Sequence, residues 1–182
     1  KYINTNIAIE GGNEVSTYRF SWSNLNNSSI EPNNRMDRNS FMLKATHKIG
    51  KVFNLTASVD FNMNRIRNPI LQGGTYSPLF AFTYLMPRNA PIMDYRHNYI
   101  DSALGGMKTG ASKDPYYLAH TMWNLFEDNS IRKENTLLAD IDLGINIAPG
   151  LTGLVRANVT NYNDNTEQKT RGSGPGFSSG AF

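Results

Sequence analysis

Residues 53–63 read FNLTASVDFNM, and this stretch decides the fold. Apolar and polar side chains alternate along its whole length. Successive side chains of a β-strand leave from opposite faces. One face would therefore carry only apolar side chains, from Phe53 to Met63, and the other only polar ones, from Asn54 to Asn62. The stretch predicts a strand whose two faces meet different surroundings.

The same alternation returns elsewhere in the chain. Asn135–Ile147 repeats it, with Leu138 as an apolar exception on the polar face. Weaker versions occupy Tyr2–Glu10, Val15–Ser23, Arg38–Ile49 and Leu151–Tyr162. All of these segments reach roughly the 9–11 residues that a tilted strand needs to cross a bilayer, whereas strands of soluble proteins average about 5–6. They predict an all-β protein with about six long strands in antiparallel hairpins.

Short and long connections between these strands alternate. The short ones are turns with Gly or Pro at 11–14, 50–52 and 148–150, and the long ones cover 24–37, 64–134 and 163–182. Outer-membrane barrels have short periplasmic turns and longer extracellular loops. We therefore predict a transmembrane β-barrel segment whose second, fourth and sixth strands run outward. Tyr18, Phe20 and Trp22 would then lie toward the outer end of the second strand, as an aromatic girdle.

The composition fits such a wall. Hydrophobic residues make up 39% and charged residues 18%, below the averages of soluble domains, which are about 45–50% and about 25%. The net charge is +3 with scattered basic residues, so no nucleic-acid partner is indicated. The absence of Cys excludes thiolate metal sites and cysteine nucleophiles. No apolar run is long enough for a transmembrane helix.

The connection from Asn64 to Glu134 is too long for a plain loop. Residues 77–86 predict a short helix, with Ser77 as a cap and Pro87 ending it. Aromatic residues follow, and we expect a folded extracellular excursion in which they contact substrate or a partner. The alternative is that the rings only pack the excursion against itself. The candidates for substrate contact are Tyr95, Tyr99, Tyr116, Tyr117 and Trp123.

Six strands cannot complete a barrel. An open sheet edge facing lipid leaves backbone groups unpaired, and the smallest barrels have about eight strands. The chain also contains nothing that resembles a plug. We therefore expect it to be an excerpt of a longer barrel protein, with the remaining strands outside it.

Residues 7–21, IAIEGGNEVSTYRFS, resemble the first barrel hairpin of SusC/RagA-type TonB-linked outer-membrane proteins, in which a strand ends in a Gly-Gly-Asn turn. Residues 29–38, SIEPNNRMDR, are similar to the family's Gly-Ile-Ile-Pro-type loop and the Arg that follows, although the glycine is missing. The strand start at 132–137 is similar too. The resemblance implies that residues 1–182 belong to one TonB-dependent transporter barrel in the bacterial outer membrane.

The same resemblance implies the partners. It implies a barrel of about 22 strands with an N-terminal plug, a segment that contacts TonB in the periplasm, and a SusD-like surface lipoprotein as a lid. The family imports glycans, peptides and similar oligomers across outer-membrane lipid. The resemblance does not identify the substrate.

Charged residues on the polar strand faces are the other candidate contacts, either to substrate or to the plug: Arg19, Asp60, Asp140, Asp142 and Arg156. A carboxylate pair could indicate acid–base catalysis. We favour lumen-wall charges paired across neighbouring strands, because charges on the lipid face would be costly. The three His residues are far apart in sequence. We expect no catalytic, cofactor or metal site, and no enzyme.

Three functions follow from the sequence. The first is energised, plug-gated import of a bulky nutrient, with this segment as barrel wall and loops. The second is a passive pore or adhesin-type barrel, which a plug upstream of Lys1 would exclude. The third is a soluble secreted β-rich binding domain, which would dissolve without detergent and pack its apolar faces against a second sheet.

Overall fold

The computed structural model describes residues 1–69, 78–103, 105–110 and 118–172. It divides into two compact units. We call the first the sheet unit; it comprises Lys1–Ser28, Arg35–Ile66 and Arg132–Thr166. We call the second the loop unit; it comprises Ser29–Asn34, Arg67–Ile131 and Glu167–Phe182.

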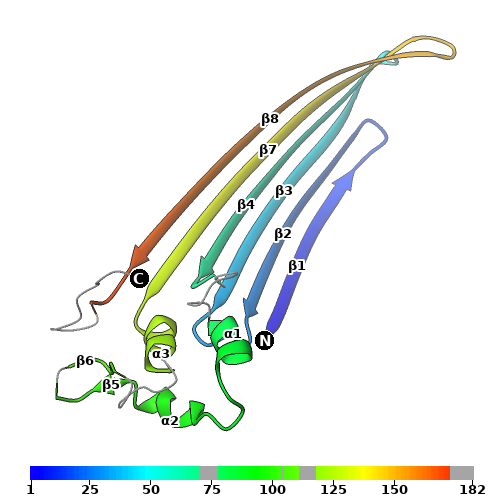
Figure 1. Cartoon of the computed structure of the whole chain (residues 1–182). Helices are drawn as coiled ribbons and strands as arrows, with labels where there is room; N and C mark the ends of the chain where they lie inside the picture. The colour runs from blue at the N-terminus through cyan, green and yellow to red at the C-terminus, as the bar shows by residue number, and fades with distance from the viewer. Residues whose placement is uncertain (70–77, 104, 111–117, 173–182) are drawn as a thin grey trace. The chain divides into compact units, whose positions relative to one another are not determined.

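The sheet unit is one layer of six strands (Figure 1). The strands lie side by side in the order β1-β2-β3-β4-β7-β8, which follows their order in the chain, and β1 and β8 form the two edges. Figure 1 shows the three tight turns at the same end of the sheet. The strand bounds are β1 Tyr2–Gly12, β2 Ser16–Ser28, β3 Arg35–Ile49, β4 Phe53–Arg67, β7 Asn129–Ala148 and β8 Leu151–Lys169. The predicted long antiparallel strands are confirmed.

The strands reach further from the turns than the alternation predicted. β2 runs on to Ser28 and β3 begins at Arg35, so most of the predicted loop at 24–37 is strand. β7 has 20 residues and β8 has 19. These extensions are mostly polar and have only isolated apolar residues such as Leu25 and Ile131, so hydrophobic alternation could not mark them. The girdle prediction was wrong in position, because Tyr18 lies two residues into β2, at the end nearest the tight turn.

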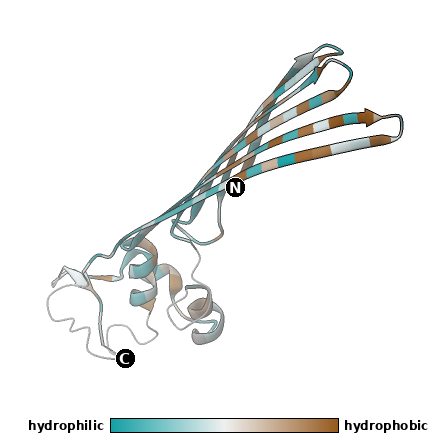
Figure 2. Ribbon diagram, turned by 90° about the horizontal axis from the view of Figure 1, so that it is seen from above, coloured by the Kyte–Doolittle hydropathy of each residue, from teal (hydrophilic) through white to brown (hydrophobic). Residues whose placement is uncertain are grey.

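One face of the sheet carries the apolar side chains. The register pairs Ile9 with Phe20 and Phe20 with Leu43, and strand alternation appears as brown and teal bands along the ribbons (Figure 2). None of the described residues of this unit is buried. On β7 the band runs from Leu137 to Ile147, where Ile141 is 55% exposed. The sheet therefore has no protein layer over its apolar face within the described residues.

The first tight turn shows why its sequence is needed. Gly12 has φ 147°, and a Cβ there would lie 2.2 Å from the Ser16 carbonyl oxygen. Only glycine fits this position. The Asn13 side-chain oxygen accepts hydrogen bonds from the backbone N–H of Val15 and Ser16 at 2.9 and 2.8 Å. This Asx-type turn fixes the register of β1 on β2.

The loop unit holds the helices and a two-residue β-ribbon. A helix was predicted at 77–86, and the structure has α1 followed directly by the π-helix η1 there, with Pro87 beyond them. Sequence analysis missed α2, α3 and the ribbon. The bounds are α1 Pro78–Phe80, η1 Ala81–Leu85, α2 Ile92–His97, β5 Ile100–Asp101, β6 Gly106–Met107 and α3 Leu118–Phe126. Among the described residues, no helix is long and apolar enough to cross a membrane.

The loop unit has a small core of its own. Met107, Ala119 and Trp123 form a buried cluster, and Tyr95 and Tyr99 pack against it. Leu118 and Ala119 are fully enclosed. α3 contributes most of the buried side chains, because it presents Leu118, Met122 and Leu125 along one face at helical spacing.

Candidate functional site

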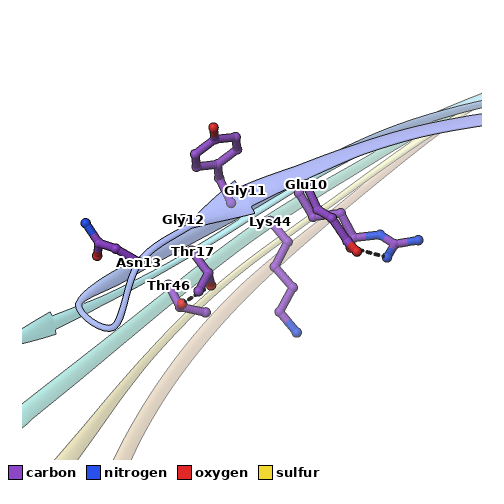
Figure 3. A pocket seen from close by; sticks show the side chains of 9 residues that line it. Glu10, Gly11, Gly12, Asn13, Thr17, Lys44 and Thr46 are labelled. Atoms are coloured by element: carbon purple, nitrogen blue, oxygen red, sulfur yellow. Dashed lines mark hydrogen bonds and ion pairs between the residues drawn. The ribbon is translucent and has the colours of Figure 1, made fainter.

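Charged side chains cross the polar face of the sheet near the tight turns. Glu10 on β1 lies opposite Arg19 on β2, which lies opposite Lys44 on β3. The Arg19 guanidinium donates to the Glu10 carboxylate at 2.9 Å. Both side chains are exposed, so their ion pair contributes little to folding. Glu10 and Lys44 leave the sheet on the same side (Figure 3).

The row of charges continues on the other strands. The Arg156 guanidinium on β8 donates to both carboxylate oxygens of Asp142 on β7, at 2.6 and 2.8 Å. Lys44 lies within electrostatic range of Asp142, and Asp140 within range of Arg156. We call the set the charge belt; it comprises Glu10, Arg19, Lys44, Asp140, Asp142 and Arg156. Three cations balance three carboxylates, so the belt offers donors and acceptors without a net charge.

The β1–β3 part of the belt lines a shallow pocket of about 450 Å³. Thr17 and Thr46 join its wall and hydrogen-bond to each other (Figure 3). Such a surface can bind a polar ligand or a second polar element of the protein. Of the sequence-predicted charges, Asp60 lies on the same face of β4 but forms no ion pair with the belt among the described residues. Because Arg156 engages both oxygens of Asp142, that carboxylate is not a free general base.

The predicted aromatic contacts have a different setting. Trp123 is 3% exposed, and Tyr99 meets its ring edge-on with centroids 6.3 Å apart. Tyr95 packs against the same cluster. These rings pack the loop unit against itself, the alternative that the sequence left open, and the faces of Trp123 are not offered to solvent. Tyr116 and Tyr117 lie outside the described residues.

Arg171, after β8, binds the C-terminal end of α3. Its guanidinium donates to Glu127 at 2.6 Å and lies 5.3 Å from the Trp123 ring centroid. Its carbonyl accepts from the Trp123 indole N–H at 3.3 Å, and its backbone N–H donates to Asp128 at 3.2 Å. Glu127 also accepts from the Tyr99 hydroxyl at 2.8 Å. These contacts join segments far apart in sequence around one ring.

Asn68 connects three segments of the loop unit. It adopts φ 46°, a left-handed conformation that Asn tolerates. Its backbone N–H donates to the Ser130 carbonyl, and its side-chain oxygen accepts from the Ser130 N–H, each at 2.7 Å. Its carbonyl accepts from the Asn34 amide at 2.6 Å. Asn68 thus links the loop at 29–34 to the segment just after β4 and to the start of β7.

Around this hub lies a pocket of about 300 Å³. Carboxylates, amides and prolines form its wall, notably Glu31, Asp128, Asn124 and Gln168. One oxygen of Glu31 is buried and has no hydrogen-bond partner among the described residues. This lining can bind hydroxyl or amino groups of a small polar ligand. None of these residues was predicted, because they come from five separate stretches of the sequence.

Two carboxylates of this wall and the adjacent Glu127 differ in their pKa shifts. Burial raises the pKa of the Glu31 carboxyl above its ordinary value of 4.5. It also raises the pKa of Asp128, against the opposing hydrogen bond from the Arg171 backbone. The hydrogen bond from the Arg171 guanidinium lowers the pKa of Glu127 instead. Three carboxylates on consecutive or neighbouring segments therefore differ in how readily each becomes neutral.

Within the described parts of the chain, no group of three or more His, Asp or Glu side chains could hold a metal ion. Comparison with protein-family models and with curated proteins gives no match for this chain. The structure offers two separate candidate sites, the charge belt of the sheet unit and the pocket around Asn68 in the loop unit.

Sequence reasoning found four members of the belt and missed Glu10 and Lys44. Both lie on the polar sides of predicted strands, so the faces were available from the sequence. Their place in the belt depends on cross-strand register, which the Gly12-Asn13 turn sets for β1 and β2. Counting outward from that turn would have placed Glu10 opposite Arg19.

Proposed function

We propose that this chain forms part of the wall and loops of a TonB-dependent transporter, which imports a bulky nutrient such as a glycan or peptide oligomer across the bacterial outer membrane. One observation carries the membrane part of the proposal. The sheet unit has a continuous apolar face, yet none of its described residues is buried. Exposed apolar patches of this extent mark an interaction surface.

The dimensions of that face suit lipid. On β7 the apolar band runs from Leu137 to Ile147. At about 3.3 Å per residue and a tilt of roughly 40°, this length spans about 25 Å, the height of the apolar band of outer-membrane barrels. The opposite face carries the charge belt, as expected of a polar barrel interior. Further strands would pair with the edges β1 and β8 and remove the unpaired backbone groups.

The import function rests on the resemblance of residues 7–21 and 29–38 to SusC/RagA-type proteins. It implies energy coupling through TonB, a SusD-like lipoprotein partner and an oligomeric substrate. In this proposal the charge belt faces the interior, where substrate or plug lies, and the loop unit is extracellular. The pocket around Asn68 is the candidate loop contact for substrate.

Spin labels test the membrane assignment on the complete protein in liposomes. The chain has no native Cys, so Val59→Cys and Asp60→Cys give neighbouring labels on opposite faces of β4. We expect the Val59 label to be reached by oxygen, which concentrates in lipid, and the Asp60 label by a water-soluble nickel chelate. Equal accessibility of the two labels, or a soluble protein without detergent, would contradict the proposal.

Import is tested in cells that lack the gene and in cells that express it. The oligomer to use is one that supports growth of the expressing cells only. Its uptake should stop when the proton-motive force is collapsed. Uptake that continues without energy would instead identify a passive pore.

A further inference from the structure

Two cations lie side by side on the apolar face of the sheet. A Cβ on Gly144 would lie 3.7 Å from the Asn54 Cβ, so these positions oppose each other on β7 and β4. Ten residues further from the turns, the Asn64 amide donates to Glu134 at 2.8 Å. The same separation on both strands means that the register is unbroken. Arg65 therefore lies opposite Lys133, on the face away from Asn64 and Glu134.

That face is the apolar one. Arg65 follows Phe61 and Met63 at the strand period, and Lys133 precedes Leu137 in the same way. Both cations are exposed. They stand just beyond the end of the apolar band, on the side away from the tight turns.

Like charges directly opposite each other destabilise a sheet unless an anion neutralises them. The neighbouring acids are already engaged. Asp37 accepts from Arg35 at 2.9 Å, and Glu134 faces the other side, where it pairs with Arg132 at 3.0 Å. Among the described residues, neither Arg65 nor Lys133 forms an ion pair.

We propose that Arg65 and Lys133 bind the phosphate of an anionic lipid in the leaflet at the loop ends of the strands. The inference rests on the proposed membrane function and adds a lipid partner to it. Arg65 lies two residues past Met63, which is about 7 Å along the strand and about 5 Å along the membrane normal at the usual tilt. This height falls in the headgroup layer, where phosphates lie. Arg and Lys both bind phosphate well.

The test measures the affinity of the complete protein in detergent for phosphatidylglycerol, by native mass spectrometry. Phosphatidylethanolamine is the zwitterionic comparison, and inorganic phosphate at the same concentration is a competitor. Near an anionic surface each cation is worth on the order of fivefold in affinity. We expect Arg65→Gln and Lys133→Gln each to weaken phosphatidylglycerol binding about fivefold, and the double variant about 30-fold.

Arg38→Gln is the matched control. Arg38 is an exposed cation on β3 that lies on the polar face, because it shares the strand period with Lys44. It should leave lipid affinity unchanged, and inorganic phosphate should not displace the lipid. Circular dichroism should show that all variants keep their strands, since removing one of two like charges relieves repulsion.

An unchanged affinity in the double variant would overturn the lipid inference, as would equal weakening by Arg38→Gln. So would displacement by inorganic phosphate, or an acidic protein that binds the wild type but not the double variant. The spin-label pair at Val59 and Asp60 separates the two proposals. If the Val59 label lies in lipid and affinity does not change, only the lipid inference fails; if it does not lie in lipid, both fail.

Discussion

The two units of this chain differ in whether their apolar side chains are buried by protein. In the loop unit, Leu118, Ala119 and Trp123 are enclosed by protein. In the sheet unit, Leu43, Ile141 and Val159 are 52%, 55% and 64% exposed, and no described residue is buried. The loop unit therefore has a buried core of its own. The sheet unit needs an apolar environment that the described chain does not supply, and we propose that lipid supplies it.

The largest expected effect comes from the core of the loop unit. Trp123→Ala should destabilise that unit by about 3–5 kcal/mol, because it leaves a cavity under Tyr99 and removes the ring that Arg171 covers. Hydrogen exchange should rise in β6 and α3 and stay unchanged in β2 and β3. Tyr84→Ala, at a ring that is 78% exposed, is the control and should cost little. Faster exchange throughout both units would mean that they do not fold independently.

The next effect concerns the sheet unit. Ile141→Arg places a cation near the middle of the apolar band and should cost about 2–4 kcal/mol when the complete protein folds into lipid vesicles. Leu138→Arg puts the same side chain on the polar face of β7 and should cost far less. Urea titrations of the vesicle-inserted protein measure both variants. If the two variants lose similar amounts of folding free energy, the apolar face of the sheet does not contact lipid, and the proposed difference between the units fails.

The smallest effects are differences in pH dependence within the loop unit. The pKa of Glu127 is lowered by Arg171, so its ionised form stabilises the folded unit at pH 7. That contribution is lost as the pH falls below 4.5 toward the folded pKa. Glu127→Gln should therefore destabilise the unit at pH 7 by about 1 kcal/mol, and the difference from wild type should shrink in acid.

Glu31 should behave in the opposite sense. Burial raises its pKa, so the ionised form destabilises the folded unit at pH 7, whereas the neutral form does not. Glu31→Gln should stabilise the unit at pH 7 by less than about 1 kcal/mol, with the gain disappearing once the wild-type carboxyl is protonated. Parallel thermal melts at pH 7 and pH 4 compare the two variants. A stabilised Glu127→Gln protein would contradict the role assigned to Arg171.

Sequence reasoning worked best where one physical pattern dominates. Period-two alternation from Phe53 to Met63 predicted β4 and the face of each side chain. It failed where polar residues dominate both faces, as in the part of β7 before Leu137, since no alternation there distinguishes strand from loop. α3 was missed although its apolar residues recur at helical spacing from Leu118 to Leu125. The pattern covers only nine residues, which is too short a window for periodicity to distinguish a helix.

The candidate site was less predictable than the fold. Arg19 and Asp142 could be placed on the polar face from sequence, but their neighbours depend on register. The pairing of β4 with β7 joins strands separated by the whole excursion, so no local turn reveals that Asn64 meets Glu134. The pocket around Asn68 depends on the left-handed conformation of one residue and on contacts between distant loops.

The unequal strand lengths have a practical consequence for the variability of such a wall. β3 has 15 residues and β7 has 20, and the part of β7 before Leu137 is mostly hydrophilic. Backbone groups in that stretch can hydrogen-bond to water. The rim of the wall, meaning the strand parts beyond the apolar band, can therefore change in length during evolution without leaving unpaired backbone groups in the lipid hydrocarbon. Changes of two residues would preserve which side chains point inward, whereas a change of one would invert them. Because both sides of the rim are mostly polar, either change should be tolerated there, whereas within the apolar band only even changes should be.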